Sequence, residues 1–437
     1  MSTSADQEKP TIRKPNVLPL SLAALCNDTG SDMLFAFYPL FFVAVLGVEK
    51  MTLLGLIESI ALLVGMFLRP LTGRLADRAG RRHFIWVGYL SLMASRFTQG
   101  LAQAWQHLVP PKVLYEVGRA MRNPPREALL AESVEEHERG YAFGFLKSMD
   151  TVGAILGPLL GLLAFWLMSR SGVAVEQCYR YVFSIAALPT AGSIYLILRH
   201  TREVREPARP REGEAEEAGD AGQPSAPDQQ GDDEALFAPR GLLAFTVASS
   251  FFSLWAVTEN FLILCAATLL RIRRAAIWPV VILYWFINVS FAPVALLSGR
   301  LSDRIGRKPP IVAGLLVLAA LTAGFSFVPQ VSEPMAGSAF LSRAFVATAV
   351  LFLLHGAYQG LVSPSQTAFV ADLALPARRA ETLGTYSMVT GAAAVAAPLI
   401  FGLLWDRFTY RTPFIVSGIC VGLSAVMIAA FVPERRR

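Results

Sequence analysis

The ten residues Gly73-Arg-Leu-Ala-Asp77-Arg78-Ala-Gly-Arg81-Arg82 recur 226 positions later as Gly299-Arg-Leu-Ser-Asp303-Arg304-Ile-Gly-Arg307-Lys308. Each copy lies between two apolar runs that are long enough to cross a membrane. A second similarity, at an offset of 240, pairs Glu132 with Asp372 and Pro158 with Pro398. Because two copies of one unit set the architecture of a chain, we predict two related halves. The unequal offsets predict an insertion in the second half, near residues 331–342.

The composition indicates an integral membrane protein. Of 437 residues, 54% are hydrophobic and 16% are charged, whereas a soluble domain has about 25% charged residues. The apolar residues gather in long blocks without period-two alternation, and only helices or closed barrels satisfy their backbone groups in lipid. We therefore predict an all-α membrane protein with twelve transmembrane helices in two pseudo-symmetric six-helix bundles.

The predicted spans divide the chain into two bundles joined by a polar linker. The linker is rich in Glu, Asp, Pro, Gly and Ser, a composition too polar to pack, so we expect it to be disordered. The expected parts are a cytoplasmic tail (1–17), the first bundle (18–201), the linker (202–239), the second bundle (240–433) and a basic tail (434–437). The spans are 18–46, 51–72, 83–104, 107–131, 140–168, 178–199, 241–271, 276–299, 309–329, 340–372, 380–406 and 410–433.

The basic residues predict the orientation. Of the 39 lysines and arginines, 23 lie in the termini, the linker and the loops on the same side of the membrane, 10 lie in the loops on the other side, and 6 lie within the spans. Basic loops stay in the cytoplasm, so both termini should be cytoplasmic, in the plasma membrane or a bacterial inner membrane. Arg271, Arg273 and Arg274 oppose this rule locally. Residues 1–16 lack an apolar core, so we expect no removable signal peptide.

Other classes of site find little support in the sequence. The net charge of +6 is spread over span ends rather than pooled in one domain, so we expect no nucleic-acid partner. The four cysteines are far apart and are expected to be packing thiols without a metal or other cofactor. They are Cys26, Cys178, Cys265 and Cys420. No GxxxxGK[ST] loop and no catalytic constellation is present, so we expect neither ATP-driven transport by this chain alone nor an enzyme.

The repeated loop resembles the motif between spans 2 and 3 of the major facilitator superfamily, and the resemblance covers the chain apart from linker and tails. In span 5 the spacing of five residues is similar to the antiporter motif of drug/proton exchangers, departing only where Leu162 replaces a second glycine. These residues are Gly144, Gly153, Gly157, Pro158 and Gly161. The resemblance implies a cavity lined by spans 1, 4, 7 and 10, and a cytoplasmic latch at the two loops. The latch residues are Gly73, Asp77, Arg78, Arg81, Gly299, Asp303, Arg304 and Arg307.

Span 4 departs from the family pattern. Where Arg-x-x-Gln-Gly would stand, the chain reads Leu114-Tyr-Glu116-Val-Gly118-Arg119. The proton-coupling role of the family's arginine therefore cannot be carried over, although Arg119 or Arg122 can take its place.

The glycines of span 5 also have a physical reading of their own. Gly153, Gly157 and Gly161 lie at i, i+4 and i+8, which makes one helix face nearly flat and lets a neighbouring span approach closely. Pro158 adds a kink. Packing alone and a role in gating both remain open.

Ionisable residues at membrane depth cost several kcal/mol unless they are paired or hydrated, so they are candidates for function. The first half holds most of them: the candidates for proton coupling are Asp28, Asp32, Glu58 and Asp150, and their charge partners are Arg119, Arg122 and Lys147. A static network of ion pairs is the alternative to proton coupling. The expected substrate wall is polar and aromatic: Glu116, Trp255, Glu259, Asn260, Tyr284, Trp285, Asn288, His355, Tyr358 and Gln359.

These observations predict a secondary active transporter that exports a small organic molecule in exchange for protons, by alternating access. The expected partners are this substrate, protons and the lipid bilayer, and we expect a monomer. An importer or permease for a polar metabolite or siderophore is the first alternative, because one fold hosts both directions. A membrane receptor or scaffold without transport is the second.

Overall fold

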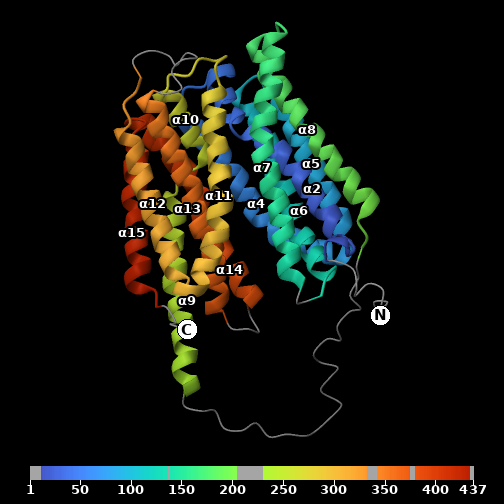
Figure 1. Ribbon diagram of the computed structural model, residues 1–437, viewed down its shortest axis with the longest axis vertical. Coiled ribbons are helices and arrows are strands. Elements are labelled where there is room, and N and C mark those ends of the chain that lie inside the picture. Colours follow the sequence, from blue (N-terminus) through green and yellow to red (C-terminus); the bar gives the residue numbers. More distant parts are fainter. Residues whose placement is uncertain (1–10, 136–137, 204–229, 332–341, 375–378, 434–437) are drawn as a thin grey trace.

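The computed structural model describes residues 11–135, 138–203, 230–331, 342–374 and 379–433. Within these residues the chain is helical, and the helices form two bundles that stand side by side (Figure 1). The first bundle holds α2 (Val17–Phe35), α3 (Phe37–Leu40), α4 (Met51–Ala79), α5 (Arg81–Gly100), α6 (Val109–Glu132), α7 (Arg139–Arg170) and α8 (Val175–His200). The second holds α9 (Gln230–Trp255), α10 (Glu259–Leu269), α11 (Trp278–Ile305), α12 (Lys308–Phe327), α13 (Arg343–Leu373), α14 (Arg379–Arg407) and α15 (Thr412–Phe431).

The first span of each half is interrupted. In the first half α2 gives way to α3 and then to a π-helical turn (Phe41–Val45), because Pro39 has no N–H to bond the carbonyl group of Phe35. In the second half α9 ends at Trp255, and α10 begins at Glu259. The carbonyl group of Trp255, freed by this break, accepts a 2.7 Å hydrogen bond from Ser417 of α15. With each interrupted pair counted as one span, the predicted twelve-helix fold is confirmed.

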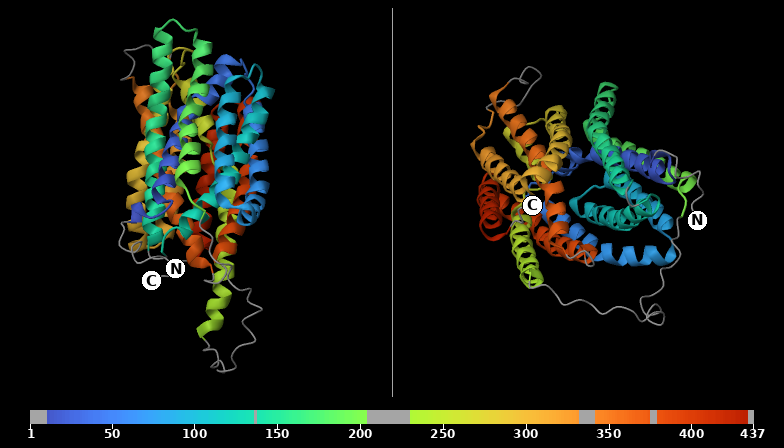
Figure 2. Two further views of the ribbon diagram at one scale, coloured as in Figure 1. Left: turned by 90° about the vertical axis from the view of Figure 1, so that its right-hand side faces the viewer. Right: turned by 60° about the horizontal axis from the view of Figure 1, so that its bottom comes forward.

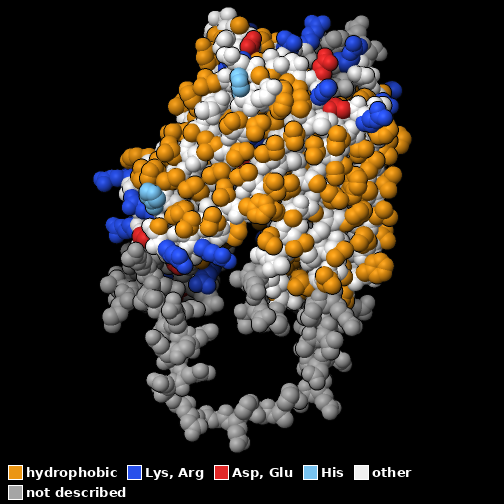
Figure 3. Space-filling model, turned by 180° about the vertical axis from the view of Figure 1, so that it is seen from behind, with side chains coloured by type: hydrophobic (Ala, Val, Ile, Leu, Met, Phe, Trp, Pro, Cys, Tyr) orange, Lys and Arg blue, Asp and Glu red, His pale blue; other side chains and the backbone are white. Residues whose placement is uncertain are grey.

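Most of the helices are apolar along their whole length. Nine helical segments of the described chain are long and apolar enough to cross a membrane. The three that fall short, α2, α5 and α6, carry polar and charged side chains that face the bundle interior. The outer surface is covered by hydrophobic side chains (Figure 3), among them Phe67, Leu188 and Phe327, which are 67%, 67% and 84% exposed. This apolar girdle is the surface that meets lipid.

The repeat seen in the sequence is also a repeat of contacts. Gly80 and Gly306, with φ of 101° and 95°, end α4 and α11 in a conformation that a residue with a Cβ rarely adopts. Just beyond each turn an arginine forms an ion pair with a carboxylate near the end of another helix of the same bundle. Arg81 pairs with Glu132 of α6, and Arg307 pairs with Asp372 of α13 at 3.2 Å. The offsets of 226 and 240 match these same residues, so the two bundles share one internal plan.

The bundles touch at one end and separate at the other. We call the end with Val17 and Phe431 the terminal end and the opposite end the distal end. Three helix pairs of the described chain join the bundles: α4 with α14, α7 with α11 and α3 with α10. At the distal end Gly55 lies against the backbone of Pro398, and Gly402 against that of Met51.

At the terminal end three of these helices, α7, α11 and α14, have glycines that face open space. A Cβ placed on Gly144, Gly299, Gly384 or Gly391 would meet no atom within 4 Å. Figure 3 shows the resulting hollow between the bundles. The described conformation is therefore closed at the distal end and open at the terminal end.

A carboxylate of the second bundle seals the distal end. Asp406, at the end of α14, accepts hydrogen bonds from the backbone N–H groups of Met51 (2.9 Å) and Thr52 (2.8 Å), and from the Thr52 hydroxyl group (2.6 Å). Lys50, which precedes α4, provides no side-chain cap. The start of α4 is thus capped from the other bundle, which satisfies free N–H groups at the positive end of the helix dipole.

Part of the predicted linker belongs to the folded structure. Helix α9 begins at Gln230, ten residues before the predicted start of the second bundle at 240. At the other edge, Glu203 accepts hydrogen bonds from the N–H groups of Arg81 (2.7 Å) and Arg82 (3.0 Å). The remainder of the linker and the tails at 1–10 and 434–437 lie outside the described residues.

Helix α7 approaches α2 through its glycines, and this contact gives a first prediction. A Cβ at Gly157 would lie 2.6 Å from the carbonyl oxygen of Thr29 and 2.8 Å from the N–H of Met33, both backbone atoms that cannot move aside. We expect Gly157→Ala to lower the free energy of unfolding by about 1–3 kcal/mol. Gly144→Ala, on the same helix but facing open space, should leave it unchanged or slightly raised. Thermal unfolding of both variants in detergent measures the difference, and equal midpoints would refute close packing at Gly157.

An ion pair outside the membrane gives a second prediction. Lys14, just before α2, donates a 2.5 Å hydrogen bond to Glu138 at the start of α7, and Thr11 donates another at 2.9 Å. The bond from Lys14 lowers the pKa of Glu138, and the same bond raises the pKa of Lys14. A lowered pKa in the folded state stabilises the protein above the unfolded value of about 4.3, and this stabilisation is lost as the pH falls through the folded value.

The measurement is the unfolding midpoint between pH 3 and pH 8. Glu138→Gln should unfold at a lower temperature than the wild type at pH 6–8, and the difference should disappear in the acid range below about pH 4. The Lys14→Met variant and the double variant complete a mutant cycle that isolates the pair. A difference that is constant with pH would show that Glu138 acts by packing alone.

Candidate functional site

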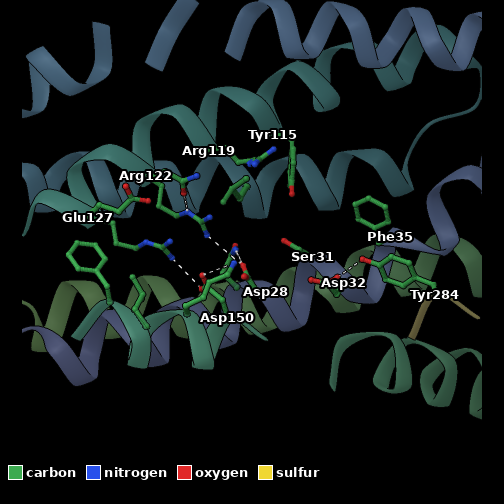
Figure 4. A pocket seen from close by; sticks show the side chains of 17 residues that line it. Asp28, Ser31, Asp32, Phe35, Tyr115, Arg119, Arg122, Glu127, Asp150 and Tyr284 are labelled. Carbon is green, nitrogen blue, oxygen red and sulfur yellow. Dashed lines mark hydrogen bonds and ion pairs between the residues drawn. The ribbon is translucent and has the colours of Figure 1, made fainter. Parts of the chain in front are cut away.

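A cavity of about 450 Å³ lies between α2, α6 and α7 of the first bundle and reaches α11 of the second (Figure 4). Its wall is mostly polar. It contains four carboxylates and four cations, together with Asn27, Ser31, Tyr115, Asn123 and Tyr284. The charged side chains are Asp28, Asp32, Glu127, Asp150, Arg119, Arg122, Arg126 and Lys147. The cavity therefore brings together all the predicted proton-coupling candidates and charge partners of the first half except Glu58.

Two ion pairs cross this cavity from α6. Arg122 lies 3.9 Å from Asp28 on α2, and Arg126 lies 3.5 Å from Asp150 on α7. Both arginines are buried, and at these separations one NH group of Arg122 is without a hydrogen-bond acceptor among the described residues. Lys147, which is exposed, is 4.0 Å from Asp150. These pairs are loose contacts that a ligand or a proton can replace without breaking a short hydrogen bond.

Glu116 is placed away from the cavity. It was predicted to line the substrate site, but its side chain points to α4, where it packs on Gly65 and lies 3.5 Å from Arg69. Arg119 donates a 2.9 Å hydrogen bond to Glu116, three residues earlier on the same helix. Because the face of α6 turns between Glu116 and Arg122, the first charge belongs to the α4 contact and the later ones belong to the cavity.

Asp32 is held from the second bundle. Tyr284 of α11 donates a 2.5 Å hydrogen bond to its carboxylate, and the ring of Tyr284 stacks on Phe35 at a centroid distance of 5.0 Å. Among the described side chains, no lysine or arginine forms an ion pair with Asp32. Figure 4 shows Asp32 and Tyr284 at the end of the cavity away from the arginines.

Glu58 is also held across the bundles. It is buried on α4 and accepts a hydrogen bond from Asn260 of α10. On its other side Lys112 of α6 approaches to 3.7 Å, and the ammonium group of Lys112 lies 4.2 Å above the ring of Tyr38. Lys112 and Tyr38 were not singled out from the sequence, since Lys112 lies near the start of a predicted span, after two prolines, where a charged residue is ordinary.

The polar residues predicted for the second-bundle wall form a separate chain. Gln359 of α13 donates a 2.7 Å hydrogen bond to Glu259 and lies 3.3 Å from His355, which is buried. The ring of Tyr358 contacts His355 at 5.4 Å. Trp255, Trp285 and Asn288 each have a buried N–H group without a described partner. Of the residues predicted for this wall, Tyr284 lines the cavity, whereas the hydrogen-bonded residues Glu259, Gln359 and His355 do not.

Arg96 is the main charged residue whose position the sequence did not reveal. A lone arginine in span 3 suggested either a side chain that reaches toward the membrane surface or a structural role, and Arg96 is 1% exposed, which agrees with the structural role. It donates hydrogen bonds to Asn27 (2.8 Å), Ser31 (2.5 Å) and Thr190. Asn27 in turn donates to Asp28 at 2.7 Å. Arg96 thus fixes the face of α2 that carries the two aspartates, and a buried cation held by neutral oxygens has no spacing signature in a sequence.

The predicted latch motifs are only partly visible. Asp77 and Asp303 lie in α4 and α11, but their side chains fall outside the described residues. Arg78 and Arg304 are exposed, whereas Arg81 and Arg307 form the repeated pairs with Glu132 and Asp372. Gly73 is close only to Pro124, and Gly299 faces open space. In the described conformation these loops stand at the open end.

The glycine face of α7 lies directly behind the aspartates. Gly153 packs on Leu25 and Thr29 of α2, Gly157 on Thr29 and Met33, and Gly161 on Met33 and Phe37. Pro158 is buried inside α7, and Gly144 lies beyond this contact at the open end. The close approach therefore sets the position of the α2 segment that carries Asp28 and Asp32.

The sequence comparisons agree with this architecture. Residues 20–347 and 334–437 match the Major Facilitator Superfamily. An uncharacterised MFS-type transporter of Methanocaldococcus jannaschii is 27% identical over 94% of each chain. Multidrug resistance protein MdtG of Enterobacter lignolyticus is 26% identical over 92% of this chain and 88% of its own.

Solved structures share the fold at low identity. The nucleoside transporter NupG (a D323A mutant) superposes with a TM-score of 0.72 at 13% identity, over 96% of this chain and all of its own. A D-xylose–proton symporter superposes with a TM-score of 0.70 at 17% identity, over 96% and 97% of the two chains. With two six-helix bundles, a repeated loop motif and a family match along nearly the whole sequence, the chain is a multi-pass integral membrane protein and belongs to the Major Facilitator Superfamily, whose members are transporters of small molecules rather than enzymes.

Proposed function

We propose that this transporter exports a small organic molecule in exchange for protons, by rocking its two bundles about the central cavity. The observation that carries the proposal is the charged cavity of the first bundle, which reaches Tyr284 of the second bundle, in a conformation closed at the distal end by Asp406 and open at the terminal end. A carrier works when such a site is exposed to one side at a time. The likeness to multidrug resistance protein MdtG supports export.

The terminal end is proposed to face the cytoplasm, because the loops there carry most of the basic residues. The repeated loops with Asp77 and Asp303 would then close that side when the bundles rock, with Arg81 and Arg307 anchoring each loop to α6 and α13. We also propose the domain division of 18–201 and 240–433, with α9 extending into the linker, and a monomeric transporter in the plasma membrane.

Asp32 is the proposed proton carrier. It lies in the cavity wall without a cation in contact, whereas Asp28 and Asp150 are each beside an arginine. A carboxylate without a cation partner at membrane depth is stabilised by binding a proton, and it can release that proton when its surroundings change. Asp28, Asp150 and Glu58 are the next candidates, and Arg119, Arg122 and Lys147 are the charges that tune them.

Uptake of a polar metabolite is the second candidate function. The cavity wall has eight charged side chains and few apolar ones, which suits a charged or strongly polar substrate better than a lipophilic drug. Two of the solved relatives are a nucleoside transporter and a D-xylose–proton symporter. The direction of proton-driven flux separates this candidate from export.

The test is flux in proteoliposomes under an imposed proton gradient, with a compound that raises the unfolding midpoint in a thermal-shift screen. We expect Asp32→Asn to reduce proton-driven flux to the level of protein-free vesicles while the compound still raises the midpoint. Glu176→Gln, an exposed carboxylate on α8 at the distal surface, is the matched control and should keep wild-type flux. Wild-type rates that ignore the gradient would refute proton coupling, whereas an active Asp32→Asn would refute only this assignment.

A further inference from the structure

Two hydrogen bonds inside the membrane join the bundles, and each has the same chemistry. Tyr284 of α11 donates to Asp32 of α2, and Asn260 of α10 donates to Glu58 of α4. In both, the acceptor is a carboxylate of the first bundle and the donor is a neutral side chain of the second. Each hydrogen bond therefore joins a carboxylate that can gain or lose a proton to a donor that stays neutral.

Tyr284 contacts α2 in two ways, through its ring and through its hydroxyl group. Its ring lies flat on Phe35, with an interplanar angle of 4°, while its hydroxyl group reaches Asp32, one turn earlier on the same face of α2. Tyr284 is buried, although it lines the end of the cavity. The stacked ring keeps the hydroxyl group aimed at the carboxylate, so the strength of this bond follows the charge of Asp32.

The Asn260 contact sits at the break in the seventh span. Asn260 is the second residue of α10, next to the interruption after Trp255, and it is 5% exposed. It also borders a cavity of about 50 Å³ that Lys112, Tyr115 and Arg96 line from the first bundle. Because α10 begins beside Asn260, loss of the hydrogen bond to Glu58 frees the start of this short helix to move.

We propose that Tyr284 and Asn260 are positioning residues through which negative charge on Asp32 and Glu58 holds the distal end closed. This inference rests on the proposed proton coupling and adds the step by which a proton alters the conformation. A hydrogen bond to a charged carboxylate is about twice as strong as one between neutral groups. A proton on Asp32 or Glu58 therefore weakens the bond between the bundles and favours opening of the distal end.

The consequence is a rule for exchange. A transporter with no proton and no substrate bound keeps its carboxylates charged, so its distal end stays closed and its terminal end stays open. It cannot change conformation while it is empty. Either a proton, which weakens the two bonds, or a substrate that competes for Tyr284 releases it. A carrier that changes its conformation with a proton or a substrate, but not when empty, is an exchanger. The two donors thus favour antiport over symport.

Other charges act on the same carboxylates and belong in the account. Asp32 is influenced by Asp28 on its own helix, Arg96 on α5 and Glu259 on α10. Glu58 is influenced by Lys112 and Glu116, both on α6, and by Glu259 on α10. Asp406 at the distal surface is a further carboxylate in a contact between bundles, so the response to pH has to be assigned with variants of the donors.

The experiment measures the distal opening of the full chain in lipid nanodiscs. Spin labels at Ser171→Cys and Thr409→Cys, on exposed distal positions of the two bundles, report their separation when the native cysteines are replaced. Between pH 8 and pH 5 the ratio of closed to open protein should fall about tenfold in the wild type, a change that corresponds to about 1.4 kcal/mol. Asp32→Asn should lower that ratio at pH 8 already.

The donor variants decide the proposal. Tyr284→Phe keeps the stacked ring and should lose most of the response to pH, and adding Asn260→Leu should remove the rest of the response assigned to the two bonds. Tyr179→Phe is the matched control, because Tyr179 donates across the bundles to the carbonyl oxygen of Arg274, which does not titrate. It should keep the full response.

Two outcomes would overturn the inference: a wild type whose distal opening ignores pH, or a Tyr284→Phe/Asn260→Leu variant that responds to pH like the wild type. Folding of each variant is verified by an unfolding midpoint in detergent. The flux assay separates the two proposals. If the wild type shows proton-driven flux but the donor variants open with pH like the wild type, the proposed function stands and the role of the two hydrogen bonds is refuted. If the distal opening depends on the donors but there is no proton-driven flux, the role of the bonds stands and the proposed function is refuted.

Discussion

An ion inside a bilayer has to be paired, hydrogen-bonded or hydrated, because burying it alone costs several kcal/mol. In this protein that constraint organises the first bundle. Arg122 and Arg126 of α6 stand opposite Asp28 and Asp150, and the buried Arg96 is held by neutral oxygens of α2 and α8. The charges fix α2, α6 and α7 around one cavity. The glycine face of α7 makes this arrangement possible, since it lets α7 approach the segment of α2 that carries the aspartates.

The two bundles repeat one plan but differ in chemistry. Both have an interrupted first span, a glycine turn with positive φ, and an arginine–carboxylate pair beside that turn. The first bundle adds a charged interior, whereas the second presents hydrogen-bond donors and aromatic rings. Where the bundles meet, this difference places Tyr284 and Asn260 of one bundle against Asp32 and Glu58 of the other. A symmetric scaffold thereby holds an asymmetric contact between the moving parts.

Particular residues show how far the sequence could go. The hydrophobic blocks and the repeated loop predicted the helix order, because apolar length and repetition are local properties of a chain. The charged residues of the cavity, such as Asp28, Arg122 and Asp150, were also within reach, because an ionisable residue inside a predicted span is a candidate for function. Glu116 was harder to place: it lies six residues before Arg122 on α6, and the helix points its side chain to Gly65 of α4 rather than into the cavity. The partners of Arg96 and Lys112 could not be predicted, because they come from other helices.

The sequence by itself determined the family, the two related halves and the choice of charged residues, because each of these is written in composition, spacing or a short motif. Only the tertiary structure decided which carboxylates are paired with arginines and which are held across the bundles. It also decided that Asp406 caps α4, and that the distal end is closed. Those properties depend on the rotation and relative position of helices that are hundreds of residues apart, and a helix turned by about one residue, roughly 100°, presents a different side chain to its neighbour.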